Sequence, residues 1–159
     1  MEERKLKVAI YLRVSTTEQN LENQKLPLIN YCERMGWEYE IFQEKESTRK
    51  TRPIQWDLYN RLLRREFDGL VIYSFSRWAR STMELVDHME RLIEKGIQIY
   101  SYTENVDIST SMGRAMLTII SAFAQLERDL IRERTIAGLN RARAQGKKLG
   151  RPRKIKPPL

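Results

Sequence analysis

Short apolar runs alternate with longer amphipathic segments along residues 8–102 of this chain. The runs at 8–14, 37–42, 70–73 and 97–102 have the length and composition of strands, and the first alternates with a period of two. The segments at 21–35, 54–67 and 82–95 show helical spacing. Strands that are separated by helices join through right-handed crossovers. The sequence therefore predicts an α/β fold, with a mostly parallel four-stranded sheet and helices on both of its faces.

Local signals indicate where these helices begin and end. Gly36 and Gly96 stand where the first and third helices should stop, because glycine adopts the left-handed backbone of a helix C-terminus. Ser81 or Thr82 can cap the start of the third helix, and Pro27 either kinks the first helix or marks its first turn. Residues 43–53 are expected to form a loop. Five side chains of the second helix are expected to be available to the core: Trp56, Leu58, Tyr59, Leu62 and Leu63.

Residues 112–144 contain no proline, and their apolar side chains recur at helical spacing. A continuous helix of this length spans ~50 Å, which exceeds the width of a domain of this size. Its first half is expected to pack on the sheet and its second half to project. A break near Gly138, with the rest folding back, is the alternative. A projecting helix with apolar and basic stripes predicts a partner, either another subunit or a nucleic-acid groove.

The whole chain has a net charge of +8, and the positive charge is concentrated at its C-terminal end. Residues 134–159 carry nine Lys and Arg side chains and no Asp or Glu, whereas residues 1–133 carry 20 basic and 21 acidic side chains. A nearly neutral body with a basic tail indicates a polyanionic partner, and nucleic acid is the commonest one. A merely solvated charged tail is the alternative.

Length and composition argue against several classes of protein. A chain of 159 residues is expected to form one domain, and its lone cysteine, Cys32, is expected in the core without a disulfide. No apolar run approaches the ~20 residues of a membrane span, and the N-terminus lacks a signal peptide's apolar centre, so the cytoplasm is the expected location. The sequence has no His/Cys cluster for zinc and no glycine-rich phosphate loop. The only histidine, His88, is expected on a helix far from the site described next.

The first strand ends by delivering a serine with an arginine two residues before it, in "VAIYLRVSTTEQ". Ligands of open parallel sheets bind beyond the carboxyl ends of the strands, where Ser15 stands. Arg13 points to the same side of the chain as Ser15, because side chains alternate along a strand. Ser15 could serve only as a helix cap with Glu18, since "STTE" fits a capping box. Capping does not explain the guanidinium of Arg13 in an otherwise apolar strand.

More arginines follow the other strands at the same edge of the sheet. Arg77 and Arg80 come directly after the third strand, and on a helical turn they would share one face. Arg49, Lys50 and Arg52 lie in the loop after the second strand. Guanidinium forks suit phosphate oxygens and stabilise the charge that builds on them during transfer. A hydroxyl nucleophile among arginines predicts phosphoryl transfer at a phosphodiester.

Five motifs in this order, "YLRVSTTEQ", "RP", "FSRWAR", "GRAMLTIISAFAQLERDLIRERT" and "GKKLGRPRK", span residues 7–154. With them the chain resembles the catalytic domain of the serine recombinases, the resolvase/invertase family. The resemblance implies a site-specific DNA recombinase whose serine attacks a DNA phosphate to form a 5′-phosphoserine link and release a 3′-hydroxyl, followed by strand exchange and religation. It further implies double-stranded DNA as substrate, a homodimer in solution or on DNA, a tetramer in the active complex, and no metal or other cofactor.

The motifs carry the family's residue roles onto this chain. Ser15 corresponds to the nucleophile. The resemblance implies that the residues binding the scissile phosphate are Arg13, Arg52, Arg77 and Arg80. Supporting positions in or near the site are Gln19, Gln24, Ser47, Ser76, Glu127 and Arg128. The resemblance and the basic tail together indicate these candidate DNA-binding residues: Arg134, Arg141, Arg143, Lys147, Lys148, Arg151, Arg153 and Lys154.

The chain departs from the family pattern at three places. Ser76 stands where many members have aspartate, which removes a carboxylate beside Arg77. The basic residue that the family often places on the helix after Arg52 has three candidates, namely Arg61, Arg64 and Arg65. The family commonly continues past "GRP" into a DNA-binding region, so this chain either is a fragment or recognises DNA elsewhere. "GRPRK" itself could track a minor groove.

The expected organisation is a catalytic α/β part at 1–111, a long oligomerisation and DNA-contacting helix at 112–146, and a basic tail at 147–159. Two rival functions stay open. One is a catalytically silent DNA-binding or assembly module of the same fold. The other is hydrolysis of a small phosphoester by the same serine, although such an enzyme needs neither a basic tail nor a projecting helix.

Overall fold

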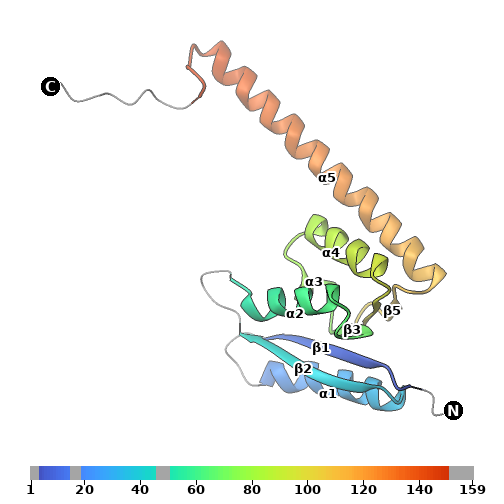
Figure 1. Cartoon of the computed structure of the whole chain (residues 1–159). Helices are drawn as coiled ribbons and strands as arrows, with labels where there is room; N and C mark the ends of the chain where they lie inside the picture. Colours follow the sequence, from blue (N-terminus) through green and yellow to red (C-terminus); the bar gives the residue numbers. More distant parts are fainter. Residues whose placement is uncertain (1–3, 15–18, 46–50, 151–159) are drawn as a thin grey trace.

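The computed structural model describes residues 4–14, 19–45 and 51–150 of the chain. At its centre is a five-stranded sheet in the order β2-β1-β3-β4-β5 (Figure 1). The strands are β1 (Lys7–Val14), β2 (Glu38–Lys45), β3 (Gly69–Ile72), β4 (Gln98–Ser101) and β5 (Val106–Asp107). The first four pair in parallel, and β5 pairs antiparallel with β4. The predicted α/β class and mostly parallel sheet are confirmed, but the predicted number of four strands is wrong.

The fifth strand and the end of the second were both missed for physical reasons. β5 has two residues, too few to show a period, and it follows a reversal at Asn105, whose φ is 50°. β2 continues to Lys45, although residues 43–45 were expected in a loop. Its polar end is held by the ladder to β1, in which Arg13 is the partner of Glu44 and Val14 the partner of Lys45.

Five helices occur in the described residues: α1 (Gln19–Arg34), α2 (Pro53–Leu63), α3 (Phe75–Trp78), α4 (Thr82–Glu94) and α5 (Ser111–Ala144). Gly36 and Gly96 follow α1 and α4 with φ of 70° and 75°, as predicted. Ser81 is the residue that caps α4, because its hydroxyl accepts a hydrogen bond from the backbone N–H of Glu84 at 3.2 Å. Pro27 lies inside α1 rather than in its first turn.

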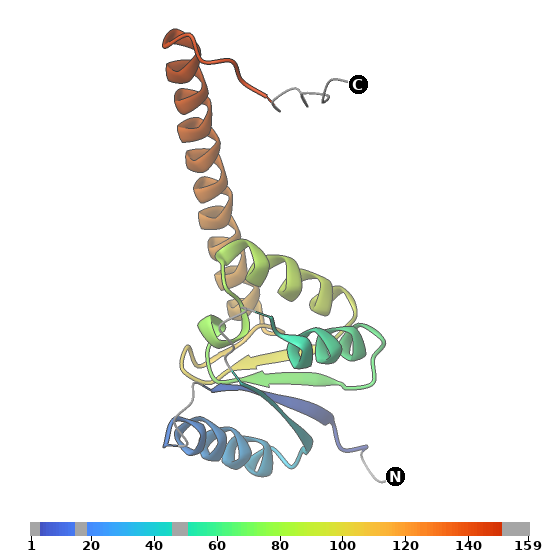
Figure 2. The ribbon, with the colours of Figure 1, turned by 90° about the vertical axis from the view of Figure 1, so that its left-hand side faces the viewer.

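The alternating side chains of β1 divide the protein into two apolar layers. Val8, Ile10 and Leu12 face α1 and pack with its Leu28 and Cys32. Cys32 is buried as expected, and burial raises the pKa of its thiol to about 11. α1 covers this face of the sheet alone, while α2, α3 and α4 cover the opposite face (Figures 1 and 2).

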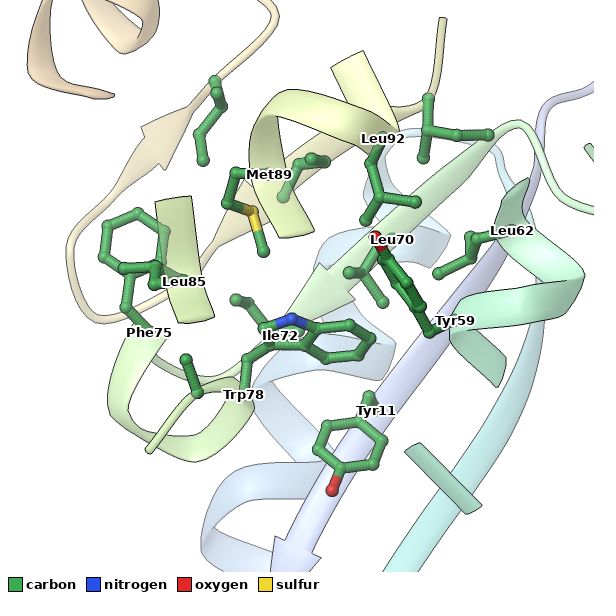
Figure 3. Packing of buried hydrophobic residues seen from close by; sticks show 14 of the residues in the cluster. Tyr11, Tyr59, Leu62, Leu70, Ile72, Phe75, Trp78, Leu85, Met89 and Leu92 are labelled. Carbon is green, nitrogen blue, oxygen red and sulfur yellow. The ribbon is translucent and has the colours of Figure 1, made fainter. Parts of the chain in front are cut away.

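The second layer is the larger one. Ala9 and Tyr11 of β1 enter it, and the indole of Trp78 fills its centre at 0% exposure (Figure 3). The α2 side chains behave as predicted except at two positions. Trp56 is 62% exposed instead of being in the core, because it lies on the outer side of the first turn of α2, and Leu63 is only partly buried.

The long helix is continuous from Ser111 to Ala144, so no break occurs at Gly138. It packs mainly on α4, and its main contact with the sheet is at β5, whereas its first half was expected on the sheet itself. Gly113 allows the close approach, since a Cβ there would lie 2.1 Å from the carbonyl oxygen of Asp107. The C-terminal half extends away from the body (Figure 1). In the described ranges, no helix has both the length and the apolarity that crossing a membrane demands.

Candidate active site

Three chain segments bring arginines to the carboxyl edge of the sheet. Arg13 is the penultimate residue of β1, and Arg52 precedes the first residue of α2, which follows β2 in the chain. Arg77 belongs to α3 and Arg80 comes just after it, beyond the end of β3. Because the strands are parallel, these connections lie at one edge. The arginine cluster, meaning Arg13, Arg52, Arg77 and Arg80, therefore stands where the sequence predicted it.

Backbone carbonyls of α3 hold two members of the cluster. The Nη2 of Arg13 donates to the carbonyl oxygen of Ser76 at 2.9 Å. The Nη1 of Arg52 donates to the carbonyl oxygen of Trp78 at 2.6 Å, and the side-chain amide of Gln55 donates to the same oxygen. A guanidinium has five N–H donors, so the contact with Trp78 leaves other donors of Arg52 for an anion.

The cluster concentrates positive charge. In the part of the chain that the structure describes, no carboxylate forms an ion pair with the guanidinium of Arg52, Arg77 or Arg80. Burial lowers the pKa of Arg52, and the positive charges of Arg13 and Arg80 lower it further. Like charges that crowd in this way favour an anionic ligand between them.

Arg77 and Arg80 do not share a helical face, contrary to expectation. α3 ends at Trp78, and Ala79 has extended backbone angles, φ −107° and ψ 155°. Arg80 is fixed instead by the next helix, where its backbone N–H donates to the carboxylate of Glu84 at 2.6 Å. The pair is thus positioned by a turn between α3 and α4 rather than by helix periodicity.

A buried carboxylate that sequence reasoning missed supports the cluster from β2. Glu44 is 3% exposed, and its Oε2 accepts a hydrogen bond from the backbone N–H of Gln55 at 2.8 Å. This contact satisfies a free N–H in the first turn of α2, next to Arg52. The available signal was the alternation of β2, because Glu44 follows Phe42 by two residues and so points to the same face.

The phenol of Tyr11 lies under the cluster. It is fully buried, and among residues 4–14, 19–45 and 51–150 its hydroxyl has no hydrogen-bond partner. Burial and the nearby carboxylate of Glu44 raise its pKa, whereas the positive charges of Arg52, Arg13 and Arg80 oppose the rise. The raised pKa keeps the hydroxyl neutral, and none of the described residues satisfies it.

Tyr11→Phe is expected to leave stability unchanged or raise it by about 1 kcal/mol, because the substitution removes a buried polar group that makes no hydrogen bond. Thermal denaturation of the two proteins checks this expectation. Tyr59→Phe is a matched comparison, since the hydroxyl of Tyr59 is also buried with no hydrogen-bond partner in the described part of the chain. A fall of several degrees in Tm for Tyr11→Phe would show that its hydroxyl has a stabilising partner.

A pocket of about 440 Å³ opens beside the cluster between α2 and α4. Arg52 and Arg80 line it together with Trp56, Tyr59 and His88. His88 was expected far from the site, but α4 runs back along the sheet and brings it here. Its Nδ1 accepts a hydrogen bond from the indole N–H of Trp78 at 3.1 Å. No sequence signal linked these two residues.

The supporting residues are brought to the site only in part. Ser76 lies on the exposed side of α3, with its hydroxyl 3.0 Å from that of Ser74. Glu127 of α5 lines a second hollow together with Ser76 and Arg80, whereas Arg128 is exposed elsewhere on the helix. Gln24 is buried in α1. Ser15, Ser47 and the side chain of Gln19 lie outside the described residues.

The candidate DNA-binding residues also lie partly inside and partly outside the described part of the chain. Those in the described part are all exposed, on α5 or just after it: Arg134, Arg141, Arg143, Lys147 and Lys148. Arg151, Arg153 and Lys154 lie outside it. Among the three candidates after Arg52, Arg61 and Arg64 both form ion pairs with Glu66. Across residues 4–14, 19–45 and 51–150, no three His, Cys, Asp or Glu side chains converge as metal ligands would.

The chain is similar to known proteins over most of its length. The family model described as "Resolvase, N terminal domain" matches residues 8–148. The transposon Tn917 resolvase of Enterococcus faecalis is 44% identical over 147 residues, which cover 92% of this chain and 76% of that protein. The DNA-invertase hin of Salmonella typhimurium is 40% identical over 149 residues, covering 91% and 73%. The N-terminal catalytic domain of TP901-1 integrase aligns with a TM-score of 0.69 at 32% identity, covering 78% and 98%.

The fold, the order of the motifs and these matches define an enzyme that breaks and rejoins DNA. The chain belongs to the resolvase/invertase family of serine recombinases, of which it forms the catalytic domain.

Proposed function

We propose that Ser15 is the nucleophile of this recombinase and that the arginine cluster binds the scissile DNA phosphate. The Oγ of Ser15 attacks phosphorus and gives up its proton. The bond from phosphorus to the 3′-oxygen breaks, and that oxygen takes up a proton and leaves as a 3′-hydroxyl. The 5′-phosphoserine keeps the phosphodiester's energy, so a new 3′-hydroxyl can reverse the step and join the strands. No external energy source is needed.

The single observation that carries this proposal is the arginine cluster. The positive charges of Arg13 and Arg80 act on Arg52, Arg77 follows β3 at the same edge of the sheet, and Ser15 follows Arg13 by two residues. Donors that are fixed before the substrate arrives stabilise charge as it develops on the phosphoryl oxygens. Arg13 and Arg52 are already fixed by the carbonyls of α3.

The test is to trap the covalent intermediate. The full chain is incubated with a library of random-sequence duplexes, denatured with detergent, and the DNA that stays attached is sequenced. Attachment should block the 5′ end of the DNA and leave the 3′ end open to exonuclease, and peptide mass spectrometry should place the phosphate on Ser15. If DNA binds but no adduct forms, the chain acts as a silent assembly module. Attachment at the 3′ end contradicts the chemistry.

The long helix supports the further proposal of a homodimer on double-stranded DNA, with a tetramer in the active complex. Apolar side chains of α5 stay exposed beyond the contact with α4; Phe123, for example, is 64% exposed. The others are Ile119, Leu126, Leu130 and Ile131. A second copy of the same helix is the partner that buries such a stripe symmetrically. The basic residues after Arg134 then continue from the dimer onto DNA.

Truncation after Arg134 is expected to leave the fold intact and weaken DNA binding. It removes eight of the nine basic residues of the tail, and the described residues of that segment bury no side chain. Each lost phosphate contact should flatten the slope of log affinity against log salt by ~0.9. Sedimentation at micromolar protein measures the oligomeric state, and a salt titration of DNA binding measures the contribution of the tail. A strict monomer with and without DNA, together with an unchanged salt slope, would contradict both proposals.

A further inference from the structure

Backbone carbonyls of the short helix α3 bind Arg13 and Arg52, but α3 is too short to be stable by itself. It has four residues, and its N-cap residue Ser74 makes no side-chain capping bond. A single helical turn is unstable alone, because nucleation fixes several dihedral angles for very few hydrogen bonds. The position of α3 therefore depends on what its side chains contact in the core.

Trp78 is the anchor of α3. Its carbonyl oxygen accepts hydrogen bonds from Arg52 and Gln55, and its neighbours Arg77 and Ala79 lead to the rest of the cluster. Its indole packs edge-on against Tyr11, with ring centroids 5.2 Å apart. Figure 3 shows the two rings together at the base of this layer. Trp78 thus contacts the buried ring of Tyr11 through its side chain and the donors Arg52 and Gln55 through its backbone.

The indole N–H of Trp78 is the one polar atom of this anchor side chain, and His88 accepts from it through Nδ1. The ring of Tyr59 stacks on His88 at a centroid distance of 4.2 Å and fixes the plane of the imidazole. With Nδ1 accepting, His88 must be neutral and carry its proton on Nε2. If Nδ1 were also protonated, its N–H would face the indole N–H of Trp78, and the hydrogen bond between them would be lost.

We propose that Trp78 and His88 form a positioning pair that sets the geometry of the arginine cluster, so that DNA cleavage requires neutral His88. This inference rests on the proposed function of the cluster. His88 touches no reacting atom and acts through Trp78. Its effect is on the alignment of Arg52, Arg77 and Arg80 with the phosphate, and misalignment by about 1 Å can reduce a rate by up to ~100-fold.

The pH at which the pair fails follows from the groups around His88. Burial lowers its pKa from 6.5, the carboxylates of Glu84 and Asp87 on α4 oppose this, and Arg91 lowers it. Tyr59 of α2 and Trp78 of α3 face it as neutral groups, and Arg52 and Arg80 line the same pocket. The pair is therefore intact at neutral pH and breaks as pH falls below 6.5 through the lowered pKa of the folded protein.

Two variants of the full chain separate positioning from simple packing. His88→Asn places an amide oxygen where Nδ1 accepts, whereas His88→Leu keeps apolar volume and has no acceptor. The rate of covalent adduct formation, the Kd for DNA and Tm are measured from pH 5 to 8. The wild-type rate should fall below pH 6.5. His88→Asn should cleave close to the wild-type rate without that fall, and His88→Leu should lose roughly 10- to 100-fold at every pH, with Kd within about twofold.

A second readout does not depend on activity. The indole N–H resonance of Trp78, assigned by its loss in Trp78→Phe, should shift with pH in the wild-type chain and stay constant in His88→Asn. If His88→Leu fails to fold, Trp78→Phe replaces it, with the same expected rate loss and a flat pH profile. A wild-type cleavage rate in the variant without an acceptor overturns the proposal. Equal losses of rate in His88→Asn and His88→Leu also overturn it, and so does an indole N–H resonance that does not shift with pH in the wild-type chain. A wild-type chain that forms no adduct at any pH defeats the proposed function instead.

Discussion

Replacing Ser15 with alanine is expected to abolish DNA cleavage while DNA binding and assembly persist. The substitution removes the oxygen that forms the bond to phosphorus, and loss of a nucleophile of this kind lowers a rate by on the order of 10⁴- to 10⁶-fold. At most, the substitution also removes one helix cap, worth ~1 kcal/mol. The measurement is the yield of detergent-resistant protein–DNA adduct, with the Kd for the same DNA determined in parallel.

Thr110→Ala is the matched control for this experiment. The hydroxyl of Thr110 caps α5 by accepting from the backbone N–H of Gly113 at 3.1 Å, away from the arginine cluster. This variant should lose about 1 kcal/mol of stability and keep its cleavage rate. If Ser15→Ala still formed the adduct, Ser15 would not be the nucleophile, and its interpretation as a helix cap alone would be favoured.

Much of the fold could be predicted because periodicity records which face of an element is buried. The alternation of Val8, Ile10 and Leu12 appeared in the sequence, and these side chains do pack on α1. The unbroken helical spacing of residues 112–144 likewise predicted α5. β5 and α3 were missed because two and four residues are too short to show a period. Their positions are set by tertiary contacts instead.

The arginines of the site could be found because parallel strands deliver their following residues to one edge. Arg13, Arg52 and Arg77 each follow or end a strand, so topology alone places them at the same edge of the sheet. Their support could not be found in this way. Glu44 is hidden in a strand end that looks polar, and the bond between Trp78 and His88 joins side chains ten residues apart through the fold of α4. Nothing in local spacing encodes such a contact.

Replacing any arginine of the cluster with lysine is expected to reduce the cleavage rate by roughly 10²- to 10³-fold, the usual effect of losing one donor aimed at developing charge. Arg52→Lys is the sharpest case. Arg52 uses one nitrogen of its guanidinium to bind the carbonyl of Trp78, so the rest of the fork can reach the phosphate at the same time. A lysine ammonium is a single point without the planar fork, and it cannot hold both geometries.

The charge is the same in Arg52→Lys, so long-range attraction of DNA should persist and Kd should change little compared with the rate. Single-turnover adduct formation with saturating DNA isolates the chemical step from binding. Arg34→Lys is the control, because Arg34 is exposed in the last turn of α1, on the far side of the sheet from α2. Arg77→Lys and Arg80→Lys should resemble Arg52→Lys rather than Arg34→Lys. A normal single-turnover rate in Arg52→Lys would mean that the cluster attracts DNA by charge alone and does not bind the scissile phosphate with an oriented fork.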